Sequence, residues 1–105
     1  MISSADRCKD MTELRAEIDR IDRALIALLG ERVACIDRAV ELKRAEGLPA
    51  RIDARVAEVL ENVRCEAGRK GLDAALAERL WSEMIEWSIT REERVLGSGQ
   101  GRTDA

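Results

Sequence analysis

The chain has 105 residues, enough for one domain with a small core, and its composition favours helix because it is rich in Ala, Leu, Glu and Arg. Its net charge of −3 argues against a nucleic-acid partner, and it contains no apolar run long enough to span a membrane. It lacks histidine, and its three widely spaced cysteines form no metal pattern. We therefore expect no metal site and no His-based catalysis, and the cysteine usage favours a reducing cytoplasm.

Residues 1–9 are polar and are expected to be a flexible N-terminus. A long first helix is predicted from about Met11 to Glu46. Asp10 and Glu13 have the spacing of a capping box before it. Gly47 and Pro49 indicate where it ends.

A second helix is predicted from Ile52 or Asp53 to about Arg69, and a third from an Asp73 cap to about Leu96. The tail, residues 98–105, reads as disordered. The expected architecture is all-α, a three-helix chain with one helical domain over residues 10–97.

The length of the first helix predicts the assembly. Some 36 residues give a rod of about 54 Å, whereas a domain of this size has a radius of gyration of about 13 Å. An apolar face on such a rod needs a partner, so we expect an intertwined helical homodimer. The alternative is a kinked first helix that folds back into a monomeric bundle.

Polar residues interrupt the apolar stripes of two helices. Arg32 occupies a position on the first stripe, and a cation there requires an anion, either from the protein or from a ligand. Lys43 lies close to three turns further on and shares that face, whereas Arg15 points about 100° away and could serve a partner chain. On the third helix the predicted buried line contains two polar residues one turn apart; the line is Trp81, Ile85, Ser88, Glu92 and Val95.

Structural explanations exist for each of these residues singly. Arg32 and Glu92 could form a buried ion pair that sets the register of the bundle. Lys43 could extend from a helix end toward solvent, and Ser88 could bond to its own helix backbone. Arg15 and Arg55 could be solvated surface arginines. The joint occurrence of all of them in so small a chain favours a binding site.

The chain resembles the all-helical, AroQ-type chorismate mutases and their relatives, the isochorismate-pyruvate lyases. The similar stretches are Leu14-Arg-Ala-Glu-Ile-Asp-Arg-Ile-Asp22, Leu28-Leu-Gly-Glu-Arg32, Lys43, Pro49 with Arg55, Gly71-Leu-Asp-Ala74 and the last helix. Together they cover about residues 10 to 96.

The resemblance implies an intertwined dimer with two pockets that take a small dicarboxylate. Arg15 would reach into the pocket of the other protomer and would grip the substrate carboxylates together with Arg32. Lys43 and Glu92 would face the ether oxygen, with Arg55 and Ser88 in support. The reaction implied, within aromatic amino acid biosynthesis, is the rearrangement of chorismate to prephenate, which needs no cofactor.

Two departures from the family pattern affect this expectation. Many members carry Gln where this chain has Glu92, so Glu92 is expected to work only when protonated and activity should fall as the pH rises. Mutases usually have Glu after the arginine at the position of Arg55, and often Asp at the position of Ile52. This chain has Val56 and Ile52 there, and the Arg-Val pair is more similar to the lyases.

Chorismate mutase is therefore the first hypothesis for the function. An isochorismate-pyruvate lyase is the nearest alternative, and a mutase acting on 4-amino-4-deoxychorismate is a further one. A non-catalytic helical dimerisation module is the non-enzymatic hypothesis. The loop over residues 44–51 is expected to close over the pocket.

Overall fold

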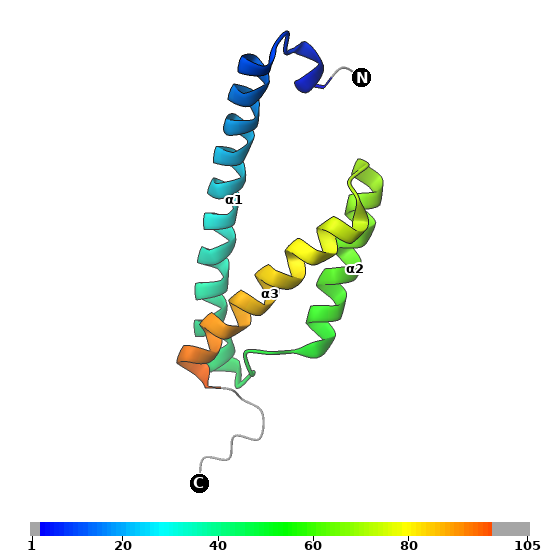
Figure 1. Ribbon diagram of the computed structural model, residues 1–105. Helices are drawn as coiled ribbons and strands as arrows, with labels where there is room; N and C mark the ends of the chain where they lie inside the picture. Colours follow the sequence, from blue (N-terminus) through cyan, green and yellow to red (C-terminus); the bar gives the residue numbers. More distant parts are fainter. Residues whose placement is uncertain (1–2, 98–105) are drawn as a thin grey trace. The chain divides into compact units, whose positions relative to one another are not determined.

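The computed structural model describes residues 3–97, which contain α-helices and one 3-10 turn but no strand (Figure 1). The helices are α1, Met11–Glu46; α2, Asp53–Lys70; and α3, Ala74–Leu96. The 3-10 turn is Ala5–Arg7. The all-helical prediction and the three predicted helices are thereby confirmed, while the predicted disordered tail lies outside the described residues.

The start of α1 is capped by side chains, although not quite as the capping box predicts. The Asp10 carboxylate accepts a hydrogen bond of 2.8 Å from the backbone N–H of Glu13, as expected. The Glu13 carboxylate accepts from the N–H of Lys9, also at 2.8 Å, one residue before the expected donor. The reciprocal cap is therefore present but extends one residue further back along the chain.

The end of α1 is a left-handed glycine turn. Gly47 has φ of 71°, a conformation that costs glycine little and most other residues more. The N–H of Leu48 donates to the carbonyl of Lys43 at 2.8 Å, and the N–H of Gly47 donates to that of Arg44. This double closure is a Schellman motif, so the helix stops at the predicted place.

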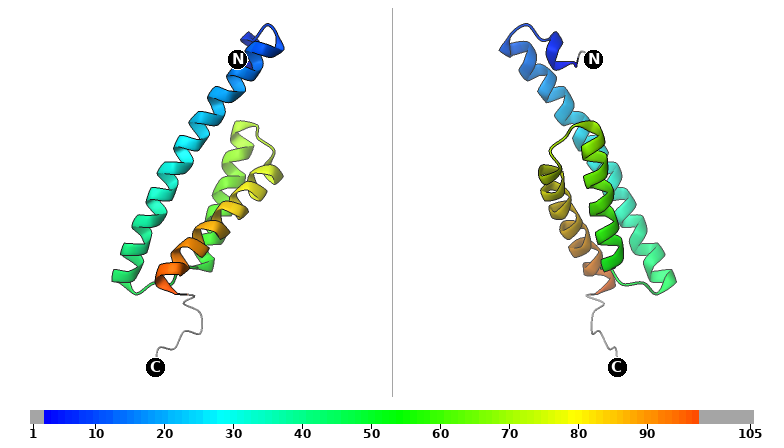
Figure 2. Two further views of the ribbon diagram at one scale, coloured as in Figure 1. Left: turned by 60° about the vertical axis from the view of Figure 1, so that its left-hand side comes forward. Right: turned by 90° about the vertical axis from the view of Figure 1, so that its right-hand side faces the viewer.

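Helices α2 and α3 form an antiparallel hairpin, and a left-handed glycine ends α2 as Gly47 ends α1. Gly71, with φ of 75°, ends α2, and Leu72 donates to the carbonyl of Ala67 at 2.8 Å. The Asp73 carboxylate then accepts from the N–H groups of Ala75 and Leu76, which caps α3 as predicted. All views show α2 and α3 side by side (Figures 1 and 2).

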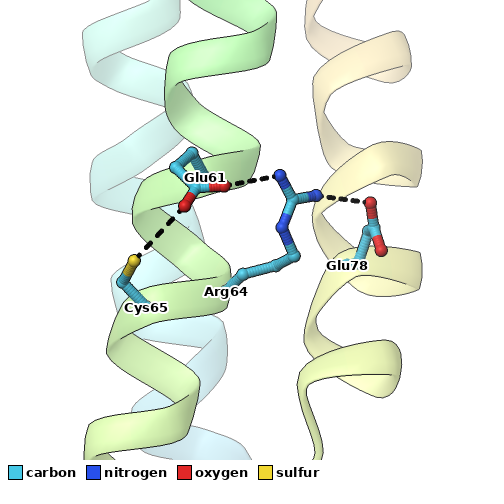
Figure 3. A network of polar contacts seen from close by, with 4 residues as sticks. All are labelled: Glu61, Arg64, Cys65 and Glu78. Carbon is cyan, nitrogen blue, oxygen red and sulfur yellow. Dashed lines mark hydrogen bonds and ion pairs between the residues drawn. The ribbon is translucent and has the colours of Figure 1, made fainter.

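A charged network ties α2 to α3. The Arg64 guanidinium on α2 donates to Glu61 of the same helix and to Glu78 of α3, each at 2.7 Å (Figure 3). Its partner Glu61 also accepts a bond from the thiol of Cys65. This arrangement joins the two helices on their exposed surface, where ion pairs contribute little to stability.

The chain divides into two compact units, residues 1–35 and residues 36–105. The second unit contains the hydrophobic core, which is built from Ala50, Ile85 and Ile89. The part-buried side chains packed against them are Val56, Val59, Leu60, Trp81 and Leu96. Val95 was predicted to be buried but is 55% exposed, because Leu96, 100° around the last turn of α3, packs against the core instead.

The first unit has no buried side chain among its described residues, 3–35. The apolar stripe predicted on the first helix is exposed over most of its length in this unit; its exposed members are Met11, Ile18, Ile21, Leu25 and Leu28. An exposed apolar stripe of this length is typical of a surface that packs against another chain. The dimer that it suggests remains a prediction.

Within residues 3–97, all three cysteines are free thiols. No helix in that range is both long and apolar enough to cross a membrane. The described residues also contain no group of three or more acidic or cysteine side chains that could hold a metal ion.

Candidate functional site

The centre of the candidate site is an ion pair between α1 and α3, within the second unit. Nζ of Lys43 lies 2.6 Å from Oε1 of Glu92. The two residues are 49 positions apart in the sequence, so only the tertiary fold brings them together. The structure thus brings two of the predicted site residues together, and their role in binding or catalysis remains a prediction.

The pair is largely buried. Glu92 is 3% exposed, and the Lys43 side chain is 19% exposed. A buried carboxylate is costly unless a cation or several donors compensate it, and the Lys43 ammonium supplies that compensation. The described part of the molecule leaves no buried side-chain nitrogen or oxygen without a partner.

Lys43 makes a second contact, with the loop that follows α1. Its ammonium donates to the carbonyl of Ala50 at 2.7 Å, and Ala50 is itself a core residue. The next residue, Arg51, pairs with Glu86 of α3, which lowers the pKa of that carboxyl and raises the pKa of the guanidinium. The loop is thus attached to the rest of the unit by a buried side chain and two polar contacts.

Ser88 lies one turn before Glu92 on α3 and is also buried. Both follow the apolar line that includes Ile85, as the sequence pattern predicts. The Ser88 hydroxyl and the Glu92 carboxylate therefore lie on one buried face of α3, and the Lys43 ammonium reaches Glu92 from α1. The Lys43 ammonium compensates the charge of Glu92 and donates hydrogen bonds to Glu92 and to the Ala50 carbonyl.

Arg55 and Val56 lie in the first turn of α2. Arg55 is exposed and pairs with Glu58 at 2.7 Å, which is the surface arrangement considered as an alternative. Val56 packs against the core. Its side chain therefore has a packing role in this chain. Ile52 precedes α2 and gives it no side-chain cap.

Arg15 and Arg32 belong to the first unit, residues 1–35. Arg15 is exposed on α1, and Arg32 is part-buried. Their predicted place beside the substrate carboxylates, with Arg15 serving a partner chain, remains a prediction, as does the contribution of Arg55.

Two contacts around the ion pair were absent from the sequence analysis. One is the Ala50 carbonyl, for which no residue pattern gives a signal because the acceptor belongs to the backbone. The other is a fork between Arg91 and Asp37, with Nε–Oδ1 of 2.6 Å and Nη2–Oδ2 of 3.1 Å. The hydrogen bond from Arg91 lowers the pKa of the Asp37 carboxyl. These residues are 54 positions apart, so their complementary charge was visible in the sequence but their contact was not.

Comparisons with known proteins bear on the same segment. Residues 14–93 match the protein-family model described as chorismate mutase type II. The isochorismate pyruvate lyase of Pseudomonas aeruginosa is 32% identical over 92 residues, which are 87% of this chain and 89% of that protein. No solved structure matches.

Longer proteins contain a similar segment. The T-protein of Enterobacter agglomerans is 34% identical over 79% of this chain, and this match covers 22% of that protein. The bifunctional chorismate mutase/prephenate dehydratase of Aquifex aeolicus is 38% identical over 52% of this chain and 15% of that protein. The matched segment, 14–93, includes most of each of the three helices and both members of the Lys43–Glu92 pair. The chain belongs to the chorismate mutase type II family.

Proposed function

We propose that this protein is a chorismate mutase that rearranges chorismate to prephenate. The observation that carries the proposal is the largely buried Lys43–Glu92 pair, a positive donor beside a carboxyl group on the buried face of α3. It occurs in a chain whose family model covers residues 14–93. Histidine is absent from the chain, and the rearrangement requires no nucleophile.

The rearrangement is a concerted shift of bonds within one molecule, so the protein must act by binding and electrostatics. It must hold a flexible dianion in the compact conformer that reacts. It must also stabilise the negative charge that develops on the ether oxygen as the C–O bond breaks. Arginines suit the first task, because the guanidinium grips a carboxylate with two hydrogen bonds.

Lys43 suits the second task. An ammonium has three N–H groups, and the contacts with Glu92 and Ala50 use two of them. The third N–H is then directed at the ether oxygen. One donor to a developing oxyanion in a dry site contributes about 3 kcal/mol of transition-state stabilisation.

Glu92 then acts in its protonated form. A carboxylate would repel both the incoming dianion and the charge on the ether oxygen, whereas a carboxylic acid donates a hydrogen bond to that oxygen. In the ligand-free protein the Lys43 ammonium compensates Glu92.

The active assembly in this proposal is a homodimer. The exposed stripe of the first unit supports it, because the described residues 3–35 have no buried side chain of their own. Arg15 lies on the same helix and would enter the pocket of the partner subunit, next to Arg32, Arg55 and Ser88. Leu25→Glu with Leu28→Glu should then shift the protein to monomers in sedimentation velocity and abolish turnover. A monomeric wild-type protein that turns over normally would contradict this arrangement.

Isochorismate-pyruvate lyase is the second candidate function. Its support is the lyase relative that this chain matches over 89% of that protein's length, together with Val56, which packs in the core instead of offering a polar group. Both reactions need a cationic pocket for a dianion. They differ in the position of the substrate hydroxyl.

The test is turnover of both substrates by the purified protein, with prephenate and salicylate both quantified. The proposal expects prephenate from chorismate, and it expects Lys43→Met to lower the rate by about two orders of magnitude, as loss of an oxyanion donor does. Arg38→Met is the matched control, because Arg38 is also a cation on α1 but is an exposed partner of Glu41. Salicylate as the main product would establish the lyase instead. Turnover of neither substrate, with no binding of a dicarboxylate inhibitor, would favour a helical dimerisation module.

A further inference from the structure

We propose that the ion pair between Asp37 and Arg91 positions Glu92 against Lys43 for the reaction. The two residues touch no substrate; they act through Glu92, so they are positioning residues. This inference rests on the proposed function for the effect on catalysis, but the structural coupling it predicts can be measured without turnover.

Two ion pairs, Lys43–Glu92 and Asp37–Arg91, join residues 36–46 of α1 to α3. Asp37 precedes Lys43 by six residues on α1, about 9 Å along the helix, and Arg91 directly precedes Glu92 on α3. The Lys43–Glu92 contact alone would act as a pivot about one point. The Asp37–Arg91 ion pair adds a second point of attachment. It limits the rotation and translation of α3 relative to residues 36–46, so that the Glu92 carboxyl keeps one position.

The Asp37–Arg91 tie is suited to fixing a direction. Both oxygens of Asp37 accept from the guanidinium, at 2.6 and 3.1 Å. A planar fork of this kind holds the two groups in one relative orientation, which a lysine in the place of Arg91 would not do. The guanidinium also lies 5.5 Å from the centre of the Trp87 ring, one turn earlier on the same helix. Trp87 and Asp37 thus both contact the Arg91 guanidinium, and together they limit its orientation.

Stability alone does not account for this pair. The Arg91 and Asp37 side chains are 39% and 50% exposed, and exposed ion pairs contribute little to folding. A small displacement of a catalytic group has a much larger effect on rate, about a hundredfold for 1 Å. Loss of the pair should therefore be nearly silent in unfolding and clearly visible in turnover.

The chain provides a matched control. Arg64 has a comparable exposure of 40% and also bridges two helices through carboxylates, but it joins α2 to α3 near their turn, away from Glu92. A general loosening of the protein would respond to Arg64→Gln and to Arg91→Gln alike. Positioning of Glu92 would respond only to Arg91→Gln.

The first experiment measures kcat and KM for chorismate. Asp37→Asn and Arg91→Gln should each lower kcat about tenfold with little change in KM, because the groups that bind the carboxylates are untouched. The exchanged pair Asp37→Arg with Arg91→Asp should recover most of the lost kcat, and Arg64→Gln should leave kcat unchanged. Equal losses in the Arg64 and Arg91 variants, or no loss in either, would overturn the positioning role.

The second experiment needs no turnover and follows the side-chain carboxyl carbon of Glu92 by NMR in the isotope-labelled protein. Arg91→Lys keeps the positive charge but cannot form the fork with Asp37, so it should shift the Glu92 carboxyl signal. Arg64→Lys should leave that signal unchanged. An unmoved Glu92 signal in Arg91→Lys would overturn the inference even if the enzyme is active. A shifted signal in a protein that turns over neither substrate would uphold the coupling and remove only the proposed reaction.

Discussion

Replacing Lys43 by methionine should destabilise the protein strongly, because it leaves the Glu92 carboxylate buried and without its cation. Methionine keeps the length and the apolar stem of lysine, so the change removes little besides the charge and its hydrogen bonds. The substitution eliminates the 2.6 Å ion pair with Glu92 and the 2.7 Å hydrogen bond to the Ala50 carbonyl.

The magnitude follows from burial. Glu92 is 3% exposed, and breaking a buried pair from one side costs about 3 to 5 kcal/mol. The Ala50 carbonyl loses its donor as well, at a cost of about 1 kcal/mol. A total of about 4 to 6 kcal/mol is a large part of the 5 to 15 kcal/mol that a domain of this kind typically has. It corresponds to a fall in melting temperature of about 20 °C.

The assay is thermal and urea unfolding at one fixed protein concentration, because the midpoint of a dimer would depend on concentration. Lys43→Met with Glu92→Gln should recover much of the loss, since a neutral amide is cheaper to bury than a carboxylate. If the single and the double variant were equally unstable at neutral pH, the destabilising agent would not be an uncompensated carboxylate, and our account of the pair would be refuted.

Three further measurements test other parts of the structure. Glu92→Gln should flatten the fall of turnover with rising pH, because glutamine donates its hydrogen bond at every pH; a profile unchanged from the wild type would refute the role of Glu92 as an acid. Asp73→Ala should cost about 1 kcal/mol in thermal unfolding through loss of the α3 cap, with turnover retained; an unchanged melting temperature would mean that solvent replaces the cap. The hydrogen bonds from Arg20 and Ser4 lower the pKa of Glu17 from 4.5 to about 2. The stabilisation of the folded protein by ionised Glu17 is therefore complete above about pH 4.5 and is lost as the pH falls through about 2. Carbon NMR titration should find this midpoint in the wild type and a higher one in Arg20→Ala, and equal midpoints in the two proteins would contradict the ion pair.

The helix boundaries were predictable because they depend on local chemistry. Gly47 and Gly71 adopt the left-handed conformation that ends a helix, and Asp73 caps the next one, each through contacts within six residues. Burial of Ser88 and Glu92 was also predictable, because both lie on the apolar line of α3. Val95 broke that rule in the last turn, where a neighbouring leucine packs against the core.

The partners of the site residues were less predictable, because they depend on tertiary contacts. The family resemblance implied that Lys43 and Glu92 lie together, whereas the residue pattern alone offered Arg32 as a partner for Glu92. The structure adds that Lys43 and Glu92 touch. The Ala50 carbonyl has no signature in a sequence, since every residue has one. The Asp37–Arg91 fork joins two exposed residues among 39 charged ones, so charge alone could not select that pairing.

Lys43 takes part both in the turn that ends α1 and in the ion pair with Glu92. The carbonyl of Lys43 accepts from Leu48, and its ammonium donates to Ala50, so residues 43–50 form a ring closed at two points by a single side chain and its own backbone. Adding or removing a residue in this ring would displace the cation as well as the turn. Exchange of this segment between relatives should therefore succeed only when the whole block from Lys43 to Ala50 is transplanted together, and this loop should tolerate changes of side chain far better than changes of length.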